Sequence, residues 1–215
     1  MNLPLTANVA CECGWDGTEA WDGSTPARFR RHAVETLKWW EGIPTVLGPT
    51  VEPTILDVAA TSRAAERAVA HGLARVMGRD VGHDVPMFPS LRTDREPDLR
   101  AWCLLMDERA LAVLFTDTVD SYGRRGETLT FGQRRRSLEA MWVSARHRGR
   151  GVGRWLLIAV QEHLSVPAVE WCYRTPVTRG AEAVVASLVP RGEMLVAGGQ
   201  MTPWERLEAQ RQARR

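Results

Sequence analysis

The sequence contains no apolar run of the length needed to cross a membrane, which is about 20 residues. Residues 1–5 have neither the basic region nor the apolar region of a secretory signal peptide. Only four cysteines occur in 215 residues, and two of them lie in apolar strand-like runs, so a secreted framework of disulfide bonds is also excluded. These absences predict a cytoplasmic protein that does not contact a membrane.

The chain also carries little net charge. The formal net charge is only +2, so the chain has no overall basic field that would attract nucleic acid. Lysine occurs once, at Lys38, and the remaining basic side chains are almost all arginine. The hydrophobic content of 44% and the charged content of 25% are ordinary for a soluble globular protein. A length of 215 residues suffices for one large domain with a small appendage.

The most informative segment runs from residue 138 to residue 164. An apolar strand over 138–143 leads into a turn rich in arginine and glycine, and an amphipathic helix follows over 154–164. The N-terminus of a helix presents unpaired N–H groups to a phosphate, glycines let the backbone approach closely, and arginines add donors. The turn therefore predicts a pyrophosphate site, built from Arg146, Arg148, Gly149, Arg150, Gly151, Val152, Gly153 and Arg154.

This turn has two other interpretations. A dinucleotide-binding loop has the spacing Gly-x-Gly-x-x-Gly, but the third glycine here, Gly153, comes one residue early. A solvated arginine turn seldom separates so apolar a strand from so amphipathic a helix. The pattern Arg148-x-x-Gly151-x-Gly153 instead resembles the coenzyme-A loop of the GNAT acetyltransferase superfamily. The resemblance implies acetyl-CoA as cofactor, with Met141, Trp142 and Val143 of the preceding strand also in contact with it.

The order of the expected elements agrees with this resemblance. The periodicities predict a helix over 62–77, a hairpin of strands 101–106 and 110–117, the strand–turn–helix segment, a strand over 168–173, a helix over 180–188 and a strand over 193–197. Such an alternation indicates an α/β or α+β sandwich, and GNAT proteins arrange their core in the same order. The resemblance implies an α+β GNAT fold with a central mixed, mostly antiparallel sheet, splayed strands and flanking helices.

Other residues resemble one branch of this superfamily, the eukaryotic sister-chromatid cohesion acetyltransferases. Met141-Trp142-Val143 stands where that branch has Ile-Trp-Val, and the segment after the second core strand matches at Glu170, Pro176 and Gly180. Two neighbouring positions depart from the branch, because Thr175 replaces an aspartate used in catalysis and Arg174 replaces a serine. Acceptor preference is therefore not implied by the resemblance.

The same branch begins with a small zinc finger, so we expect a finger-like segment over 1–50, an acetyltransferase domain over 51–200 and a charged tail over 201–215. Cys11, Cys13 and His32 occupy the place of the zinc ligands. The family pattern is Cys-x-x-Cys with two histidines, whereas this chain has Cys-x-Cys and one histidine in range. Structural zinc takes four ligands, and a carboxylate would have to supply the fourth. The alternative is a metal-free remnant packed by tryptophans.

Acetyl transfer needs a base near the amine, donors for the oxyanion and a fixed orientation. The resemblance implies that the N–H of Val143 polarises the thioester carbonyl. Two-residue alternation places Glu139, Met141 and Val143 on one face of the strand, so Glu139 is the candidate base. Its alternative role is pairing with an arginine at the sheet surface. Thr175 and Tyr173 are candidates for orienting the acceptor or water, and Tyr173 for protonating the thiolate, although a strand tyrosine is more often part of a core.

These residues predict an acetyl-CoA-dependent N-acetyltransferase whose acceptor is a primary amine, with a protein lysine as one candidate. A second hypothesis is a degenerate module that binds coenzyme A or a protein partner without turnover, suggested by the loss of the aspartate at Thr175. A third is an acetyltransferase that acts on a nucleic-acid-associated substrate, suggested by the finger and by the basic run at 133–136.

Overall fold

The computed structural model describes residues 38–45, 47, 52–80, 98–125, 127–174, 179–190, 193 and 195–197. The chain divides into two compact units, Met1–Leu37 and Lys38–Arg215, and all of these residues belong to the second. The predicted zinc ligands Cys11, Cys13 and His32, and the predicted tail, lie outside the described residues. None of the described helices is long and apolar enough to span a membrane.

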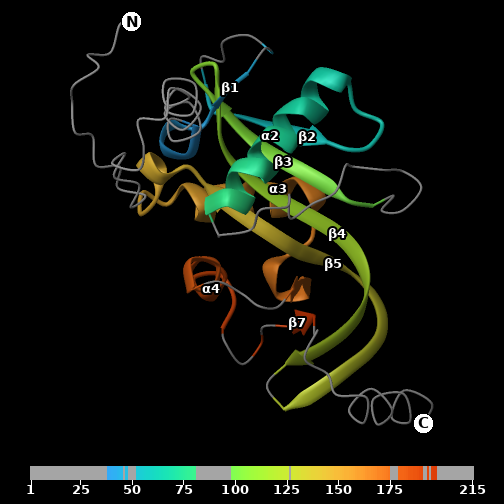
Figure 1. The fold of residues 1–215 in the computed structure, drawn as a ribbon. Helices are drawn as coiled ribbons and strands as arrows, with labels where there is room; N and C mark the ends of the chain where they lie inside the picture. The colour runs from blue at the N-terminus through green and yellow to red at the C-terminus, as the bar shows by residue number, and fades with distance from the viewer. Residues whose placement is uncertain are drawn as a thin grey trace, which may run out of the picture. The chain divides into compact units, whose positions relative to one another are not determined.

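The second unit is built on a seven-stranded sheet in the order β2-β3-β4-β5-β6-β7, with β1 paired to β4 (Figure 1). All pairings are antiparallel except β5–β6 and β6–β7, so the predicted mixed, mostly antiparallel sheet is confirmed. The strands are β1 (Ile43–Pro44), β2 (Thr54–Val58), β3 (Arg100–Met106), β4 (Arg109–Arg125), β5 (Thr128–Val143), β6 (Cys172–Arg174) and β7 (Leu195–Ala197).

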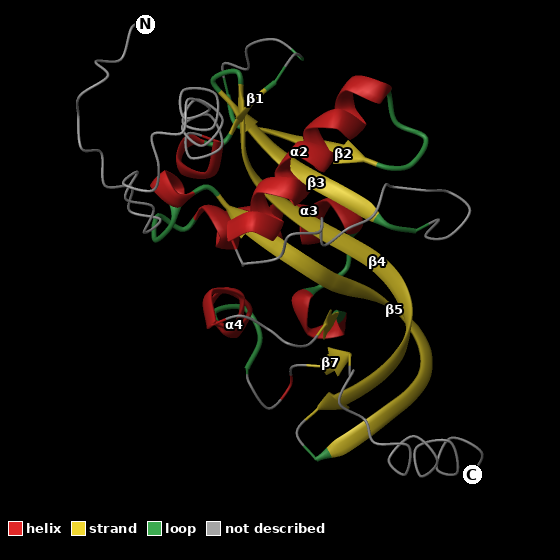
Figure 2. Cartoon of the chain, viewed as in Figure 1, coloured by secondary structure: helices red, strands yellow, loops and turns green. Residues whose placement is uncertain are grey.

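Within the described residues, three α-helices from α2 onward and two short 3₁₀ turns accompany the sheet, besides the helical turn over 38–41 (Figure 2). Helix α2 precedes β3, α3 connects β5 to β6, and α4 connects β6 to β7, so each parallel pair of strands is joined by a helical crossover. The bounds are α2 (Ala64–Asp80), η1 (Ala145–His147), α3 (Val152–Leu164), η2 (Ala168–Glu170) and α4 (Arg179–Ala186).

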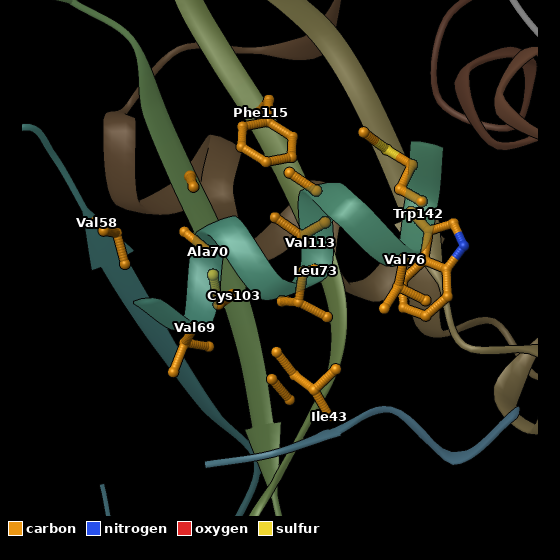
Figure 3. Close-up of a cluster of buried hydrophobic side chains, with 14 of the residues drawn as sticks. Ile43, Val58, Val69, Ala70, Leu73, Val76, Cys103, Val113, Phe115 and Trp142 are labelled. Carbon is orange, nitrogen blue, oxygen red and sulfur yellow. The ribbon is translucent and has the colours of Figure 1, made fainter. Parts of the chain in front are cut away.

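Alternating side chains of the central strands divide between two cores, one on each face of the sheet. Ala101, Cys103 and Leu105 of β3 pack in the first core with the buried face of α2. Figure 3 shows Val69, Leu73 and Val76 of α2 beside Val113, Phe115 and Trp142 of the strands. The intervening residues Trp102 and Leu104 pack in the second core with α3 and α4. Both cores therefore pack against the end of β5, where the loop to α3 begins.

Several predicted elements are correct, and others need revision. The helix over 62–77, the hairpin and the helix after the glycine turn are present as α2, β3–β4 and α3. The prediction of a strand over the whole of 168–173 is wrong, because residues 168–170 form the turn η2, and β6 begins at Cys172. Strand β2 is not among the predicted elements, and β5 begins ten residues before the predicted strand at 138, at Thr128.

Gly42 marks the point at which the chain enters the sheet. The helical turn over 38–41 ends there, and Gly42 has a φ of +87°. A Cβ at this position would lie 2.3 Å from the carbonyl oxygen of Ala110, so only glycine fits. This close approach brings the turn over 38–41 to the same end of the sheet as the loop between β5 and α3, since Arg146 in that loop pairs with Glu41.

Candidate active site

In the first turn of α3, which follows the loop after β5, no side chain caps the backbone N–H groups. Gly149 and Gly151 both have positive φ values, +70° and +79°. Gly151 is the N-cap of α3, and because it has no side chain, the first N–H groups of the helix receive no side-chain cap. These N–H groups and the positive end of the helix dipole are the features that bind phosphate in many proteins. The predicted phosphate-binding geometry of this turn is therefore present in the backbone.

Gly153 sets how closely α3 begins on the sheet. A Cβ at this position would lie 3.4 Å from the Cε and Sδ atoms of Met141 and 3.5 Å from Cγ2 of Val143. The first turn of α3 therefore packs directly against the last residues of β5. Met141 and Val143 also pack against the second core, so the predicted alternation at this end of the strand is correct. The helix N-terminus and the end of the strand form one continuous site.

The four predicted phosphate-binding arginines divide into two pairs. Arg150 and Arg154 are exposed, and within the described part of the chain they make no hydrogen bond or ion pair. Arg146 instead pairs with Glu41 at 3.3 Å. Arg148 pairs with Asp80 and donates from Nε to the carbonyl oxygen of Val143 at 2.9 Å. Arg150 and Arg154 are thus the cations available to a ligand.

His147 closes the turn that precedes these glycines. Its Nδ1 lies 2.7 Å from the hydroxyl of the fully buried Ser144, whose N–H donates to Leu111 on β4 at 2.8 Å. Burial lowers the pKa of His147, and the neighbouring Arg150 and Arg146 lower it further. Glu41 opposes this shift, and the net effect favours the neutral imidazole. These contacts make His147 part of the structure of the turn.

Strands β5 and β6 separate where the acyl group of a ligand would have to enter. Their parallel pairing consists of Ser137 with Cys172 and Leu138 with Tyr173. The next residue of β6, Arg174, still pairs with Ala197 of β7 but no longer with β5. Strand β5 continues for five more residues, to Val143. The described pairing of β5 with β6 therefore ends at Leu138, as the predicted splay requires, and beyond it β5 pairs only with β4.

Glu139 lies in a β-bulge at the start of this splay. Thr116 of β4 pairs with Leu138 and Phe115 pairs with Ala140, so Glu139 is the extra residue between two register positions. The simple alternation that placed Glu139 with Met141 and Val143 does not take account of this bulge. A bulge next to a functional site redirects a side chain that regular pairing would place elsewhere.

Asp117 is a second carboxylate beside the bulge and was not among the predicted site residues. It lies opposite Ser137, and its Oδ1 accepts a hydrogen bond from the N–H of Thr118 at 2.7 Å. Burial raises the pKa of Asp117, and nearby Glu139 and Asp98 raise it further, whereas the Thr118 N–H and Arg136 oppose this shift. A half-buried acidic residue in an otherwise apolar strand was the available signal.

Of the two remaining predicted catalytic residues, the structure describes only Tyr173. Thr175 is outside the described residues. Tyr173 is 1% exposed within the second core, and its hydroxyl donates to the carbonyl oxygen of Ala168 at 2.9 Å. Burial raises the pKa of Tyr173. This geometry favours the alternative in which Tyr173 is a core residue.

The sequence model of the family described as the Acetyltransferase (GNAT) family matches residues 76–165, from within α2 to the end of α3. This part of the chain is similar to the GNAT acetyltransferase family. The matched residues include β5, the glycine turn and α3, which are the elements that form the site. No curated protein sequence matches the chain.

Solved structures agree with the GNAT fold. The xEco2 acetyltransferase domain is 12% identical, with a TM-score of 0.54, and the match covers 74% of this chain and 98% of that one. The same domain bound to a CoA conjugate gives a TM-score of 0.55 at 12% identity, over 74% and 99% of the two chains. An aminoglycoside acetyltransferase from an uncultured soil metagenomic sample, in complex with sisomicin, is 13% identical over 70% and 95%, with a TM-score of 0.48.

Proposed function

We propose that this protein is an acetyl-CoA-dependent N-acetyltransferase that acetylates a primary amine. One observation carries the proposal: the uncapped N-terminus of α3 lies against the last residues of β5, just where β5 has separated from β6. The helix terminus suits a pyrophosphate, and the gap suits the pantetheine arm that follows it. A phosphate site alone would not require the separated strands.

The transfer then takes place at the end of β5. The amine nitrogen attacks the thioester carbonyl carbon, the C–S bond breaks, and coenzyme A leaves as a thiolate that takes up a proton. The N–H of Val143 polarises the carbonyl oxygen, as the family resemblance implies. The open amides of the first turn of α3, with Arg150 and Arg154, bind the pyrophosphate.

The amine must lose a proton during this attack, and we assign the acceptor of that proton to Glu139. The bulge places this carboxylate at the first residue of β5 beyond the pairing with β6. The nearby Asp117 interacts with Glu139 electrostatically, as the raised pKa of Asp117 indicates. A carboxylate beside the reacting amine can accept its proton as a general base.

Calorimetric titration with acetyl-CoA tests the first step. We expect micromolar binding by the wild-type chain and its loss in Gly151→Glu, which places a carboxylate at the phosphate site. The matched control is Gly132→Glu, because Gly132 also has a positive φ of +77° and open space around it but lies in the β4–β5 hairpin. Absence of binding by folded wild-type protein would refute the proposal.

For the acceptor, we propose an amine on a protein, such as a lysine side chain. The fold of this chain is similar to that of the xEco2 acetyltransferase domain, and this is the reason to test protein acceptors. A similarity of fold does not carry over the specificity for an acceptor. A screen of peptide and small amines by mass spectrometry tests this proposal. Binding of acetyl-CoA without turnover on any amine would favour the degenerate module instead.

Acetylation of a nucleic-acid-associated substrate has weaker support. The basic run that suggested it is partly engaged within the protein. Arg134 pairs with Asp98, Arg135 donates to the uncharged Gln133, and Arg136 interacts electrostatically with Asp98 and Asp117. A salt-dependent electrophoretic shift with nucleic acid would be required to retain this alternative.

We also propose that the N-terminal unit carries a structural zinc bound by Cys11, Cys13 and His32, and that the protein is cytoplasmic. Among the described residues no group of three or more metal-ligating side chains occurs, so a zinc ion would have to be bound elsewhere in the chain. Metal analysis of the wild-type protein against Cys11→Ala tests the first proposal. Fractionation of the producing cells tests the second.

A further inference from the structure

Asp80 occupies a position that is unfavourable for an acidic residue. It is the last residue of α2, and a negative charge at a helix C-terminus is opposed by the helix dipole. Its side chain is nevertheless only 14% exposed. It accepts hydrogen bonds from three side chains on other elements: Trp39 Nε1 on Oδ1, and Trp142 Nε1 and Arg148 on Oδ2. The stability of α2 does not explain this arrangement.

Arg148 is held against the sheet by these contacts. Besides its ion pair with Asp80, it donates from Nε to the carbonyl oxygen of Val143 at 2.9 Å. Its guanidinium carbon lies 5.7 Å from the ring centroid of Trp39 and 6.0 Å from that of Trp142, within cation–π range. The charge of this arginine is thus paired with Asp80 on the sheet side of the loop, although 43% of its side chain remains exposed.

Asp80 therefore joins three segments that are distant in sequence. Trp39 comes from the helical turn over 38–41, Asp80 from the end of α2, and Trp142 and Arg148 from the end of β5 and the loop after it. Figure 3 shows Trp142 beside Val76 of α2, toward the end of the helix at which Asp80 stands. Because Arg148 directly precedes Gly149, its orientation bears directly on the first residue of the glycine turn.

We propose that Asp80 is a positioning residue for acetyl-CoA. It does not touch the ligand. By fixing Arg148 it holds the glycine turn in the conformation in which the amides of α3 face the pyrophosphate, so binding does not have to order the turn. This assignment makes Arg148 a structural support, and it leaves Arg150 and Arg154 as the cations that meet the phosphates. The proposal rests on the acetyl-CoA site proposed above.

A double-mutant cycle on the full chain tests this assignment, with acetyl-CoA as the probe in calorimetry. We expect Asp80→Asn and Arg148→Ala each to weaken binding by about tenfold, a typical coupling for residues in contact. The double variant should bind about as well as the weaker single variant, because both changes remove the same support. The control is Asp57→Asn, which breaks the 2.5 Å ion pair with Arg100 on the sheet away from the loop. It should leave binding unchanged.

A direct contact between Arg148 and the phosphates predicts a different result. If Arg148 contacted the phosphates directly, freeing it from Asp80 would leave acetyl-CoA binding unchanged or strengthen it in Asp80→Asn. Either result would overturn the proposal, as would additive effects in the double variant. Thermal unfolding measured alongside shows whether each variant is folded. Arg148→Lys keeps the charge of this side chain but loses its paired contacts, so it should weaken binding to a similar extent. This variant replaces Asp80→Asn in the test if Asp80→Asn does not fold. Absence of acetyl-CoA binding by the wild-type chain would refute the proposed function itself, and this inference with it.

Discussion

The hydroxyl of Ser144 lies 2.7 Å from Nδ1 of His147, and this contact closes the turn between β5 and the glycines. Ser144 is fully buried, and its own N–H is bonded to Leu111 on β4. One residue thus anchors the turn to the sheet through its backbone and to the following 3₁₀ turn through its side chain.

Replacing Ser144 with alanine should lower the free energy of unfolding by about 1–2 kcal/mol, because a buried hydrogen bond is lost and Nδ1 of His147 loses its partner. Acetyl-CoA binding should weaken with it. Urea denaturation and calorimetry measure the two effects. Ser187→Ala is the control: its hydroxyl donates to Val184 at an exposed site, so a change of less than about 0.5 kcal/mol is expected. Equal losses in the two variants would contradict the role given to Ser144.

Replacing Glu139 with glutamine should reduce kcat by about 10²–10⁴-fold, the usual contribution of a general base, while KM for acetyl-CoA stays unchanged. The side chain keeps its size and loses its ability to accept a proton. The measurement is turnover of an amine acceptor as a function of pH, with exposed Glu162→Gln on α3 as the control. A KM effect without a kcat effect would instead assign Glu139 to ligand binding.

Asp117→Asn should stabilise the protein at neutral pH. The pKa of this carboxyl is raised above its ordinary value of 3.8, so the native state binds more protons than the unfolded state between the two pKa values. The free energy of unfolding therefore falls as pH rises through that window, and the penalty is complete above it. Urea denaturation at several pH values should show a stabilised variant at pH 7 and a difference that shrinks in acid. A constant difference would mean that the charge of Asp117 is not the cause. Turnover should fall in the same variant.

Gly42→Ala should destabilise the protein by about 3 kcal/mol, the sum of left-handed strain and a backbone clash. A Cβ there would meet the carbonyl of Ala110 at 2.3 Å, and strand β1 would have to move. The control is Gly132→Ala, which has a φ of +77° but open space, and so should cost only the strain. Thermal and urea unfolding compare the two variants. Equal costs would show that the contact with Ala110 relaxes easily.

The coenzyme-A loop could be predicted because its signals are local. A strand, a run of glycines and an amphipathic helix adjoin one another in the sequence, and the physics that makes the site acts over a few residues. The predicted helix after the turn and the observed α3, Val152–Leu164, differ at the start by two residues. The packing of Met141 and Val143 followed from the two-residue period of a strand.

The contacts of Arg148 and the bulge at Glu139 could not be predicted in the same way. Asp80 and Arg148 are 68 residues apart in sequence, and neither residue carries a local sign of the other. The bulge at Glu139 is set by the register between β4 and β5, which depends on both strands and on the cores that they separate. Arg148 was expected at the phosphate because a cation in such a turn usually faces it, whereas in the structure it pairs with the partly buried carboxylate of Asp80.

The long β4–β5 hairpin has a consequence for how copies of this chain meet in a crowded solution. Val196 of β7 pairs with Tyr173 of β6 on one side and with Arg124, near the distal end of β4, on the other. Without that second pairing β7 would be a bare edge, able to recruit a strand from a neighbouring molecule. The hairpin of the same chain already occupies that edge, as the curve of β4 and β5 toward β7 in Figure 1 shows. The fold thus protects this edge of its sheet from self-association by pairing the backbone of β7 with the hairpin of its own chain.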